Sequence, residues 1–134
     1  MKKLVIGLLA IFTLAACTGG SSAPLQGQWK LVSYGSSSDQ TLAAPDVDTS
    51  IEFLDGKLSG NVGCNGFGGD YTVDGDTITF GPVMSTLMFC EGPVGEQEAV
   101  TLAVFFETTT FILDGNMLTI TSADGNSSIV LERK

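Results

Sequence analysis

The segment YTVDGDTITF, residues 71–80, alternates apolar and polar residues on both sides of an Asp-Gly pair. Alternation with a period of two is typical of antiparallel strands that bury one face. Asp-Gly favours the type I′ turn that joins two such strands, because both central residues of that turn have positive φ. The segment therefore predicts a β-hairpin that turns at Asp74 and Gly75.

The same arrangement recurs on both sides of this hairpin. Further Asp-Gly pairs stand at residues 55–56, 114–115 and 124–125. They alternate with runs of strand-forming residues at 50–54, 57–62, 110–113, 117–121 and 128–131. Residues 28–32, with Trp29 as a large core side chain, predict an opening strand. About seven or eight short strands predict a mainly β fold, a small antiparallel barrel. Such a barrel is either filled by side chains or holds one small ligand, and both alternatives remain open.

One segment, residues 93–107, predicts an α-helix instead. Apolar residues recur there at the spacing of one helix face, at Ala99, Leu102, Ala103 and Phe106. Pro93 suits the start of a helix, and Glu96 and Glu98 suit the positive end of its dipole. The alternative is that residues 104–106 already belong to a strand.

The chain begins with a segment typical of protein export. Lys2 and Lys3 precede an apolar run at residues 4–14 that is too short to span a bilayer. The following LAAC, residues 14–17, resembles a bacterial lipobox, which implies cleavage before Cys17 and lipidation of this cysteine. The alternative is an ordinary signal peptide with a coincidental cysteine.

This resemblance divides the chain into three parts. Residues 1–16 are expected to be a removed signal peptide, residues 17–24 a lipidated cysteine with a flexible Gly/Ser tether, and residues 25–134 the folded domain. The expected location is the bacterial cell envelope, with the membrane as partner through the lipid on Cys17. Thr18, in place of Asp, resembles outer-membrane sorting, so in a Gram-negative host the domain would face the periplasm.

Composition excludes several classes of function. The net charge is −9 at pH 7, from 15 acidic and 6 basic residues, and Lys2 and Lys3 leave with the signal peptide. This charge argues against nucleic acid as a partner, and it also repels anionic lipid headgroups. The chain has no His, which excludes Ser-His-Asp and Cys-His catalysis and His-ligated zinc. We therefore predict no enzyme activity, no catalytic residue, no metal and no cofactor.

Two cysteines, Cys64 and Cys90, remain in the mature domain. A pair of cysteines in an exported domain is expected to form a disulfide bond. In the chain-entropy model, closing this loop stabilises the domain by about 3–4 kcal/mol. The alternatives are a metal site, which needs more ligands than two thiolates, and a redox pair, which usually reads Cys-x-x-Cys.

Several motifs, taken in order, resemble those of the META domain of HslJ-like proteins. They are GQWKL (27–31), GCN (63–65), GDY (69–71), STLMFC (85–90), EAVTL (98–102) and DGNMLTI (114–120). The resemblance implies a lipocalin-like barrel with one helix. It also implies links to heat shock, antibiotic tolerance and envelope stress, without an established enzymatic activity. Phe89 departs from the family pattern, where a small residue is usual.

The motif residues that we expect to matter are Trp29, Gly63, Asn65, Gly69, Tyr71, Thr86, Met88 and Glu98. Glycines are frequent around Cys64, as bends and bulges require, and Asn65 suits a turn. This favours a structural role, although Cys64, Asn65, Thr86 and Met88 could instead contact a ligand. Three methionines, Met84, Met88 and Met117, are expected to fill the core.

These observations lead to two hypotheses of function. The first is a non-enzymatic envelope lipoprotein that acts in stress tolerance through contacts with other envelope proteins, which the sequence does not identify. The second is a carrier that binds a small apolar ligand inside the barrel. A filled interior with an exposed apolar patch would favour the first, and an open apolar cavity would favour the second.

Overall fold

The computed structural model describes residues 22–134, so the predictions on the signal peptide, on Cys17 and on most of the tether lie outside the described residues. The elements are η1 (Ala23–Leu25), β1 (Gly27–Ser36), β2 (Asp39–Leu42), β3 (Ser50–Leu54), β4 (Lys57–Asn61), β5 (Gly66–Asp74), β6 (Thr77–Phe80), β7 (Met84–Ser85), α1 (Gly92–Val104), β8 (Thr108–Asp114), β9 (Met117–Thr121) and β10 (Ser127–Arg133). No helix within residues 22–134 is long and apolar enough to cross a membrane.

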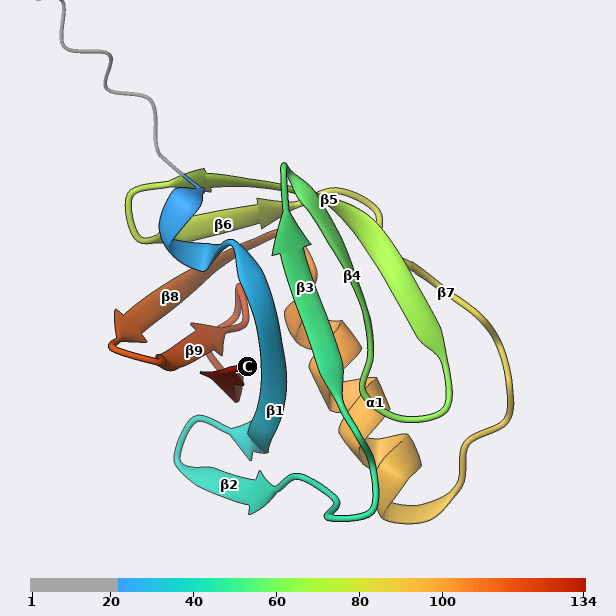
Figure 1. Ribbon diagram of the computed structural model, residues 1–134. Coiled ribbons are helices and arrows are strands. Elements are labelled where there is room, and N and C mark those ends of the chain that lie inside the picture. Colours follow the sequence, from blue (N-terminus) through green and yellow to red (C-terminus); the bar gives the residue numbers. More distant parts are fainter. Residues whose placement is uncertain (1–21) are drawn as a thin grey trace, which may run out of the picture.

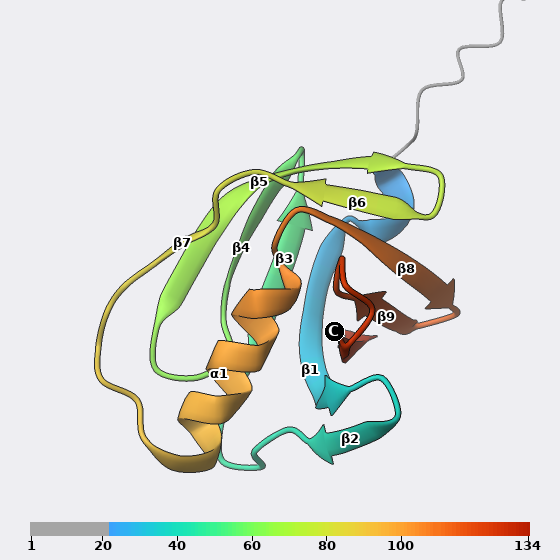
Figure 2. The same cartoon turned by 180° about the vertical axis from the view of Figure 1, so that it is seen from behind.

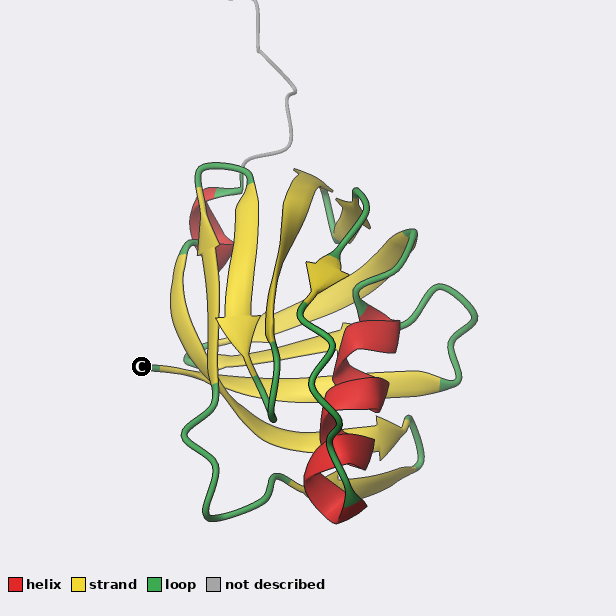
Figure 3. Ribbon diagram, turned by 90° about the vertical axis from the view of Figure 1, so that its right-hand side faces the viewer, coloured by secondary structure: helices red, strands yellow, loops and turns green. Residues whose placement is uncertain are grey.

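Eight strands form a closed antiparallel barrel, in the order β1-β3-β4-β5-β6-β8-β9-β10, and β10 pairs with β1 to close it. The remaining strands are short additions, since β2 pairs with β1 and β7 pairs with β5. Helix α1 lies along one side of the barrel (Figures 1, 2 and 3). The predicted fold class, a mainly β small barrel with one helix, is confirmed.

The Asp-Gly pairs mark hairpins, but the type I′ turn occurs at only one of the two-residue loops. Asp55 and Gly56 both have positive φ, at 49° and 75°, as a type I′ turn requires. In the β5–β6 and β8–β9 hairpins the aspartate still belongs to the strand, and the turn starts at Gly75 or Gly115. Only the glycine has positive φ there, which is typical of type II′ rather than the predicted type I′.

The interior of the barrel is filled by side chains from most of its strands. The largest fully buried ones include Trp29, Phe53, Leu58, Ile78, Ile120 and Leu131. Tyr71 packs edge-on against Phe53, with ring centroids 5.0 Å apart. At one end, the indole N–H of Trp29 donates to the Leu25 carbonyl at 2.9 Å, and Arg133 lies 4.2 Å above the indole ring. This packing fixes η1 against the barrel.

The helix differs from its prediction in length and in orientation. It ends at Val104 instead of residue 107, because Phe105 already leaves the helical conformation with ψ at 50°. Glu107, with a positive φ of 56°, then leads the chain into β8. Its buried residues are Gln97, Glu98, Thr101 and Val104. The predicted apolar face, with Ala99, Leu102, Ala103 and Phe106, is exposed or only partly buried. Polar residues occupy the inner face because backbone groups of the β4–β5 loop lie opposite and need hydrogen-bond partners.

The methionine prediction is wrong for two of its three residues. Met84 is 74% exposed and Met88 is 61% exposed, whereas Met117 is half-buried in β9. Met84 and Met88 lie on the segment between β6 and α1, which runs along the outside of the barrel. Sequence composition did not distinguish such a surface segment from the core, because both are apolar.

Tyr71 makes alkaline stability a test of this packing. Burial raises the pKa of Tyr71 above its ordinary value of 10.0. The raised pKa stabilises the folded state at pH values below 10, and this contribution is lost as the pH rises through the pKa of the folded state. We expect Tyr71→Phe to show a normal cooperative unfolding transition at pH 7. As the pH rises above 10, its free energy of unfolding should fall less than that of the unmodified chain. Urea unfolding at pH 7 to 11.5 measures both, and parallel curves for the two proteins would contradict the prediction.

Candidate functional site

Most of the motif residues predicted from the sequence meet in one cluster, which we call the clasp. It consists of Gly63, Cys64, Asn65, Thr86, Met88, Cys90 and Glu98. A disulfide bond joins Cys64 to Cys90, with their Cα atoms 5.8 Å apart. It connects the loop after β4 to the segment that leads into α1. The clasp therefore links the barrel, the segment after β7 and the helix.

Glu98 supplies the acceptor groups of the clasp. Its Oε2 accepts hydrogen bonds from the backbone N–H groups of Cys64 (2.8 Å) and Asn65 (2.7 Å). Its Oε1 accepts a third hydrogen bond, from the side-chain amide of Asn65 at 2.6 Å. Glu98 is buried, and the described residues offer it no ion pair. Three charge-assisted hydrogen bonds thus take the place of water around this carboxylate.

Asn65 continues the network to the segment after β7. Its Oδ1 accepts hydrogen bonds from the Thr86 hydroxyl (2.8 Å) and from the Met88 backbone N–H (2.7 Å). Its amide also donates to the Met88 carbonyl at 3.1 Å. Gly63 is required beside them, because a Cβ there would lie 2.8 Å from Oε2 of Glu98. Every polar atom of the Asn65 side chain is therefore used to hold residues 86–88.

The sequence analysis missed Gln97, which lies next to Glu98 and is completely buried. Its amide donates to the Val62 carbonyl at 2.6 Å, and its Oε1 accepts the Ala44 N–H at 2.7 Å. It also missed Gly95, where a Cβ would lie 2.2 Å from the Cys90 carbonyl oxygen. A polar Glu-Gln-Glu run usually indicates a solvated helix face, so no sequence signal pointed to these roles.

Three motif residues lie outside the clasp. Trp29 is at the η1 end of the barrel, and Tyr71 is in the core against Phe53. Gly69 allows the segment before β7 to approach β5, since a Cβ there would lie 3.0 Å from Val83. The motif residues thus serve at least two separate purposes, and only those of the clasp converge in space.

The clasp holds an apolar segment at the surface. Four side chains of this segment are exposed, namely Met84 (74%), Leu87 (95%), Met88 (61%) and Phe89 (87%). The polar groups of the clasp face one another, and no group of three metal-ligating side chains occurs within residues 22–134. The arrangement of the clasp holds residues 84–89 at the surface.

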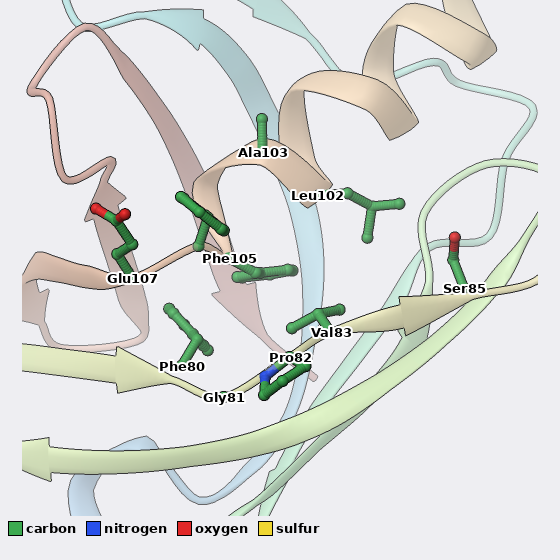
Figure 4. A pocket seen from close by; sticks show the side chains of 10 residues that line it. Phe80, Gly81, Pro82, Val83, Ser85, Leu102, Ala103, Phe105 and Glu107 are labelled. Carbon is green, nitrogen blue, oxygen red and sulfur yellow. The ribbon is translucent and has the colours of Figure 1, made fainter.

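An apolar groove of about 680 Å³ lies beside this segment, between α1 and the chain from Phe80 to Ser85 (Figure 4). Its walls include Val83 on one side and Leu102 on the other, with Phe105 between them. Three residues of the predicted apolar helix face, Leu102, Ala103 and Phe106, line it. Leu102 and Ala103 lie on α1, and Phe106 follows just after its end, so this apolar surface forms the wall of a surface groove and not part of the core.

The hydrogen bonds of the clasp predict that two glutamates of α1 differ strongly in how much they stabilise the protein. Glu98→Gln replaces one of the two acceptor oxygens by an NH2 group, which then faces at least one of the three donors, so we expect the free energy of unfolding to fall by about 1–3 kcal/mol. Glu96→Gln, on the exposed side of the same helix, is the matched control and should change stability by less than about 0.5 kcal/mol. Urea unfolding at neutral pH measures both values. Equal effects of the two substitutions would show that Glu98 does not hold the clasp.

The disulfide bond predicts a chemical property as well as a loss of stability. The oxidised, denatured protein should show no titratable thiol at Cys64 or Cys90. The double variant Cys64→Ser/Cys90→Ser should lose about 3–4 kcal/mol of unfolding free energy. Thiol titration and urea unfolding test these two statements separately. Two free thiols in the oxidised protein would exclude the bond.

Two solved structures share this fold. The first, described as an NMR structure of a protein from Burkholderia xenovorans, superimposes with a TM-score of 0.67 and 16% identity, covering 97% of this chain and 99% of that chain. The second, also an NMR structure, has a TM-score of 0.62 and 19% identity, covering 81% of this chain and 89% of that chain.

A search of curated proteins finds no significant match. The model of one protein family, the META domain, matches residues 23–134, which is the whole barrel with its helix. The match confirms the resemblance that the ordered motifs indicated. The chain therefore belongs to the META domain family.

Proposed function

We propose that this protein is a non-enzymatic lipoprotein of the bacterial cell envelope, which contributes to stress tolerance by contacting another envelope protein. The observation that carries the proposal is the exposed apolar segment at residues 84–89. Four of its side chains are more than half exposed, although leaving large apolar side chains in water forgoes about 1.5–3 kcal/mol each. Exposed apolar patches of this kind commonly mark interaction sites.

The clasp strengthens this interpretation. A flexible apolar loop would collapse onto the surface of the protein. The disulfide bond and the hydrogen bonds of Asn65 instead hold the apolar segment in place. Binding by a pre-organised segment costs less conformational entropy than binding by a mobile one. The family motif residues of the clasp thus support the surface that we propose as the contact site.

The arrangement of the chain is compatible with a lipid anchor. The described chain begins at η1, and in two opposite views the segment that follows β7 lies across the barrel from η1 (Figures 1 and 2). A lipid on Cys17 would therefore be attached through the tether on the η1 side of the barrel, which is not the side that carries the apolar segment. This supports a protein partner over the anchoring membrane itself.

The carrier hypothesis receives less support. Side chains such as Trp29, Phe53 and Ile120 are fully buried inside the barrel, where a carried ligand would have to lie. The apolar groove lies instead at the side of the barrel and is open to solvent. Native mass spectrometry of the protein purified from its own envelope tests the difference. We expect the bare processed chain, and a discrete added mass that leaves on denaturation would favour the carrier.

Lipidation at Cys17 is tested in the bacterium. We expect labelled palmitate to enter the unmodified chain and the protein to sediment with membranes. Cys17→Ala should lose both properties, because the acceptor thiol is absent. Membrane association that persists in Cys17→Ala would contradict the proposed anchor.

Stress tolerance through the exposed segment is tested by complementation. In a strain that lacks its own copy, the double variant Leu87→Ser/Phe89→Ser should restore survival under heat or envelope stress less well than the unmodified chain. Both side chains are almost fully exposed, so folding should be preserved. The double variant Leu42→Ser/Ile112→Ser, at exposed apolar positions outside this segment, is the control and should restore survival fully. Full rescue by the first variant would contradict a contact function of the segment.

A further inference from the structure

The apolar groove lies where the barrel wall opens between two neighbouring strands. The pairing of β6 with β8 ends at Thr79 and Thr108, followed by one last hydrogen bond from the Phe80 N–H to the Glu107 carbonyl at 2.9 Å. Before Glu107, Phe105 and Phe106 connect to the end of α1 at Val104, and they form no strand that continues β8. On the other side, the chain continues from β6 into β7 and stays paired with β5. The groove therefore occupies the position in which a further strand would lie beside β7.

The edge of β7 that faces this opening has free backbone groups. The Thr86 N–H donates to the Gly66 carbonyl at 3.0 Å, and Met84 lies opposite Gly68. In an antiparallel ladder, hydrogen-bonded residues alternate with residues whose backbone groups point the other way. The N–H and C=O of Ser85 consequently point away from β5. The N–H groups of Ser85 and Leu87 meet no partner among the described residues, and they have the spacing at which an added strand would bond.

The walls of the groove suit the side chains of such a strand. Phe105 lies at its base and packs against Phe80 at 5.2 Å and Phe67 at 5.6 Å between ring centroids. Leu102 and Val83 approach it from opposite sides (Figure 4). Because successive side chains of a strand point to opposite faces, every second residue of an added strand would enter this apolar space.

The charges around the groove indicate what kind of chain fits. Glu107 is exposed and lines the groove at the end opposite Ser85 (Figure 4), and its carboxylate forms no ion pair among the described residues. The cations within residues 22–134 are all engaged, because Lys30, Lys57 and Lys134 form ion pairs and Arg133 bonds two carbonyls. Residues 22–134 of a second copy therefore offer Glu107 no cation that is not already engaged, and the net charge of −9 makes two copies of the chain repel each other.

We propose that the β7 edge and the groove bind an extended segment of another protein, which adds to β7 as a strand. The segment has apolar residues at alternate positions and a Lys or Arg that pairs with Glu107. Its backbone bonds to Ser85 and Leu87, and its apolar side chains cover Val83 and Leu102. This rests on the contact function proposed above and specifies the chemistry of the partner. Strand addition of this type derives affinity from main-chain hydrogen bonds and specificity from alternate side chains.

The test uses a fluorescent peptide in which Val alternates with Thr between two lysines at each end. The full chain is reconstituted in phosphatidylcholine nanodiscs, and empty nanodiscs control for binding to lipid. We expect saturable binding by fluorescence anisotropy. With free peptide at ten times its Kd, hydrogen exchange of the Ser85 and Leu87 amides should slow about tenfold, because only the unbound fraction exchanges. The Thr86 and Met88 amides, already bonded within the protein, should change much less.

Matched peptides and variants separate the contributions. A peptide with N-methylated amides keeps its apolar side chains but loses main-chain bonding, so it should bind at least tenfold more weakly. Glu107→Gln should weaken binding about two- to fivefold, as expected for an exposed ion pair. Phe106→Ser, in the groove wall, should weaken it by at least about fivefold. The controls Asp114→Asn and Ile112→Ser, outside the groove, should bind like the unmodified chain.

Three results would overturn the inference. One is the absence of peptide binding, and another is equal binding of the N-methylated peptide, which would make the groove a site for apolar side chains alone. The third is a concentration-dependent dimer of the full chain that Phe106→Ser abolishes, which would make a second copy the occupant. None of these results decides the complementation experiment on Leu87 and Phe89, so failure of this inference and failure of the proposed function can be told apart.

Discussion

The rest of the surface depends on the hydrogen bonds that the buried carboxylate of Glu98 accepts. This carboxylate belongs to the helix, and it accepts hydrogen bonds from backbone N–H groups of the loop between β4 and β5. Through Asn65 the same network reaches Met88 and the segment after β7. A buried carboxylate is tolerated only when its hydrogen bonds are complete, so the loop, the segment and the helix must adopt their positions together. The disulfide bond then limits how far these parts can separate on unfolding.

This network also explains why the helix has its unusual orientation. A loop such as residues 62–65 leaves backbone groups unpaired inside the protein, and aliphatic side chains cannot satisfy them. Gln97 and Glu98 do so, and Leu102 on the helix and Phe106 just after its end are consequently turned outward. The same arrangement that completes the hydrogen bonds of the barrel therefore forms one wall of the surface groove.

The barrel could be predicted from the sequence because the signals of its hairpins are local. The alternation of apolar and polar residues and the Asp-Gly pairs are both recognised within about ten residues. Sequence reasoning failed where the decisive partner is distant in the chain. The turns at Gly75 and Gly115 shifted by one residue because the strands continue through Asp74 and Asp114. The inner face of the helix was misassigned because its partners are backbone groups 33 to 35 residues away. The clasp residues were nominated by family resemblance, and only the structure gives them a common geometry.

An open strand edge with apolar neighbours is a liability, because it can pair with any extended chain, including another copy of the protein. This edge is restricted in ways that limit such pairing. Strand β7 is only two residues long, Pro82 has no N–H to offer, and Glu107 places a negative charge at one end of the groove. These features reject long flat strands and acidic chains, including this one, but they leave the Ser85 and Leu87 amides available. This edge excludes most partners but keeps two backbone amides available. Selective binding explains such an edge better than incomplete folding does.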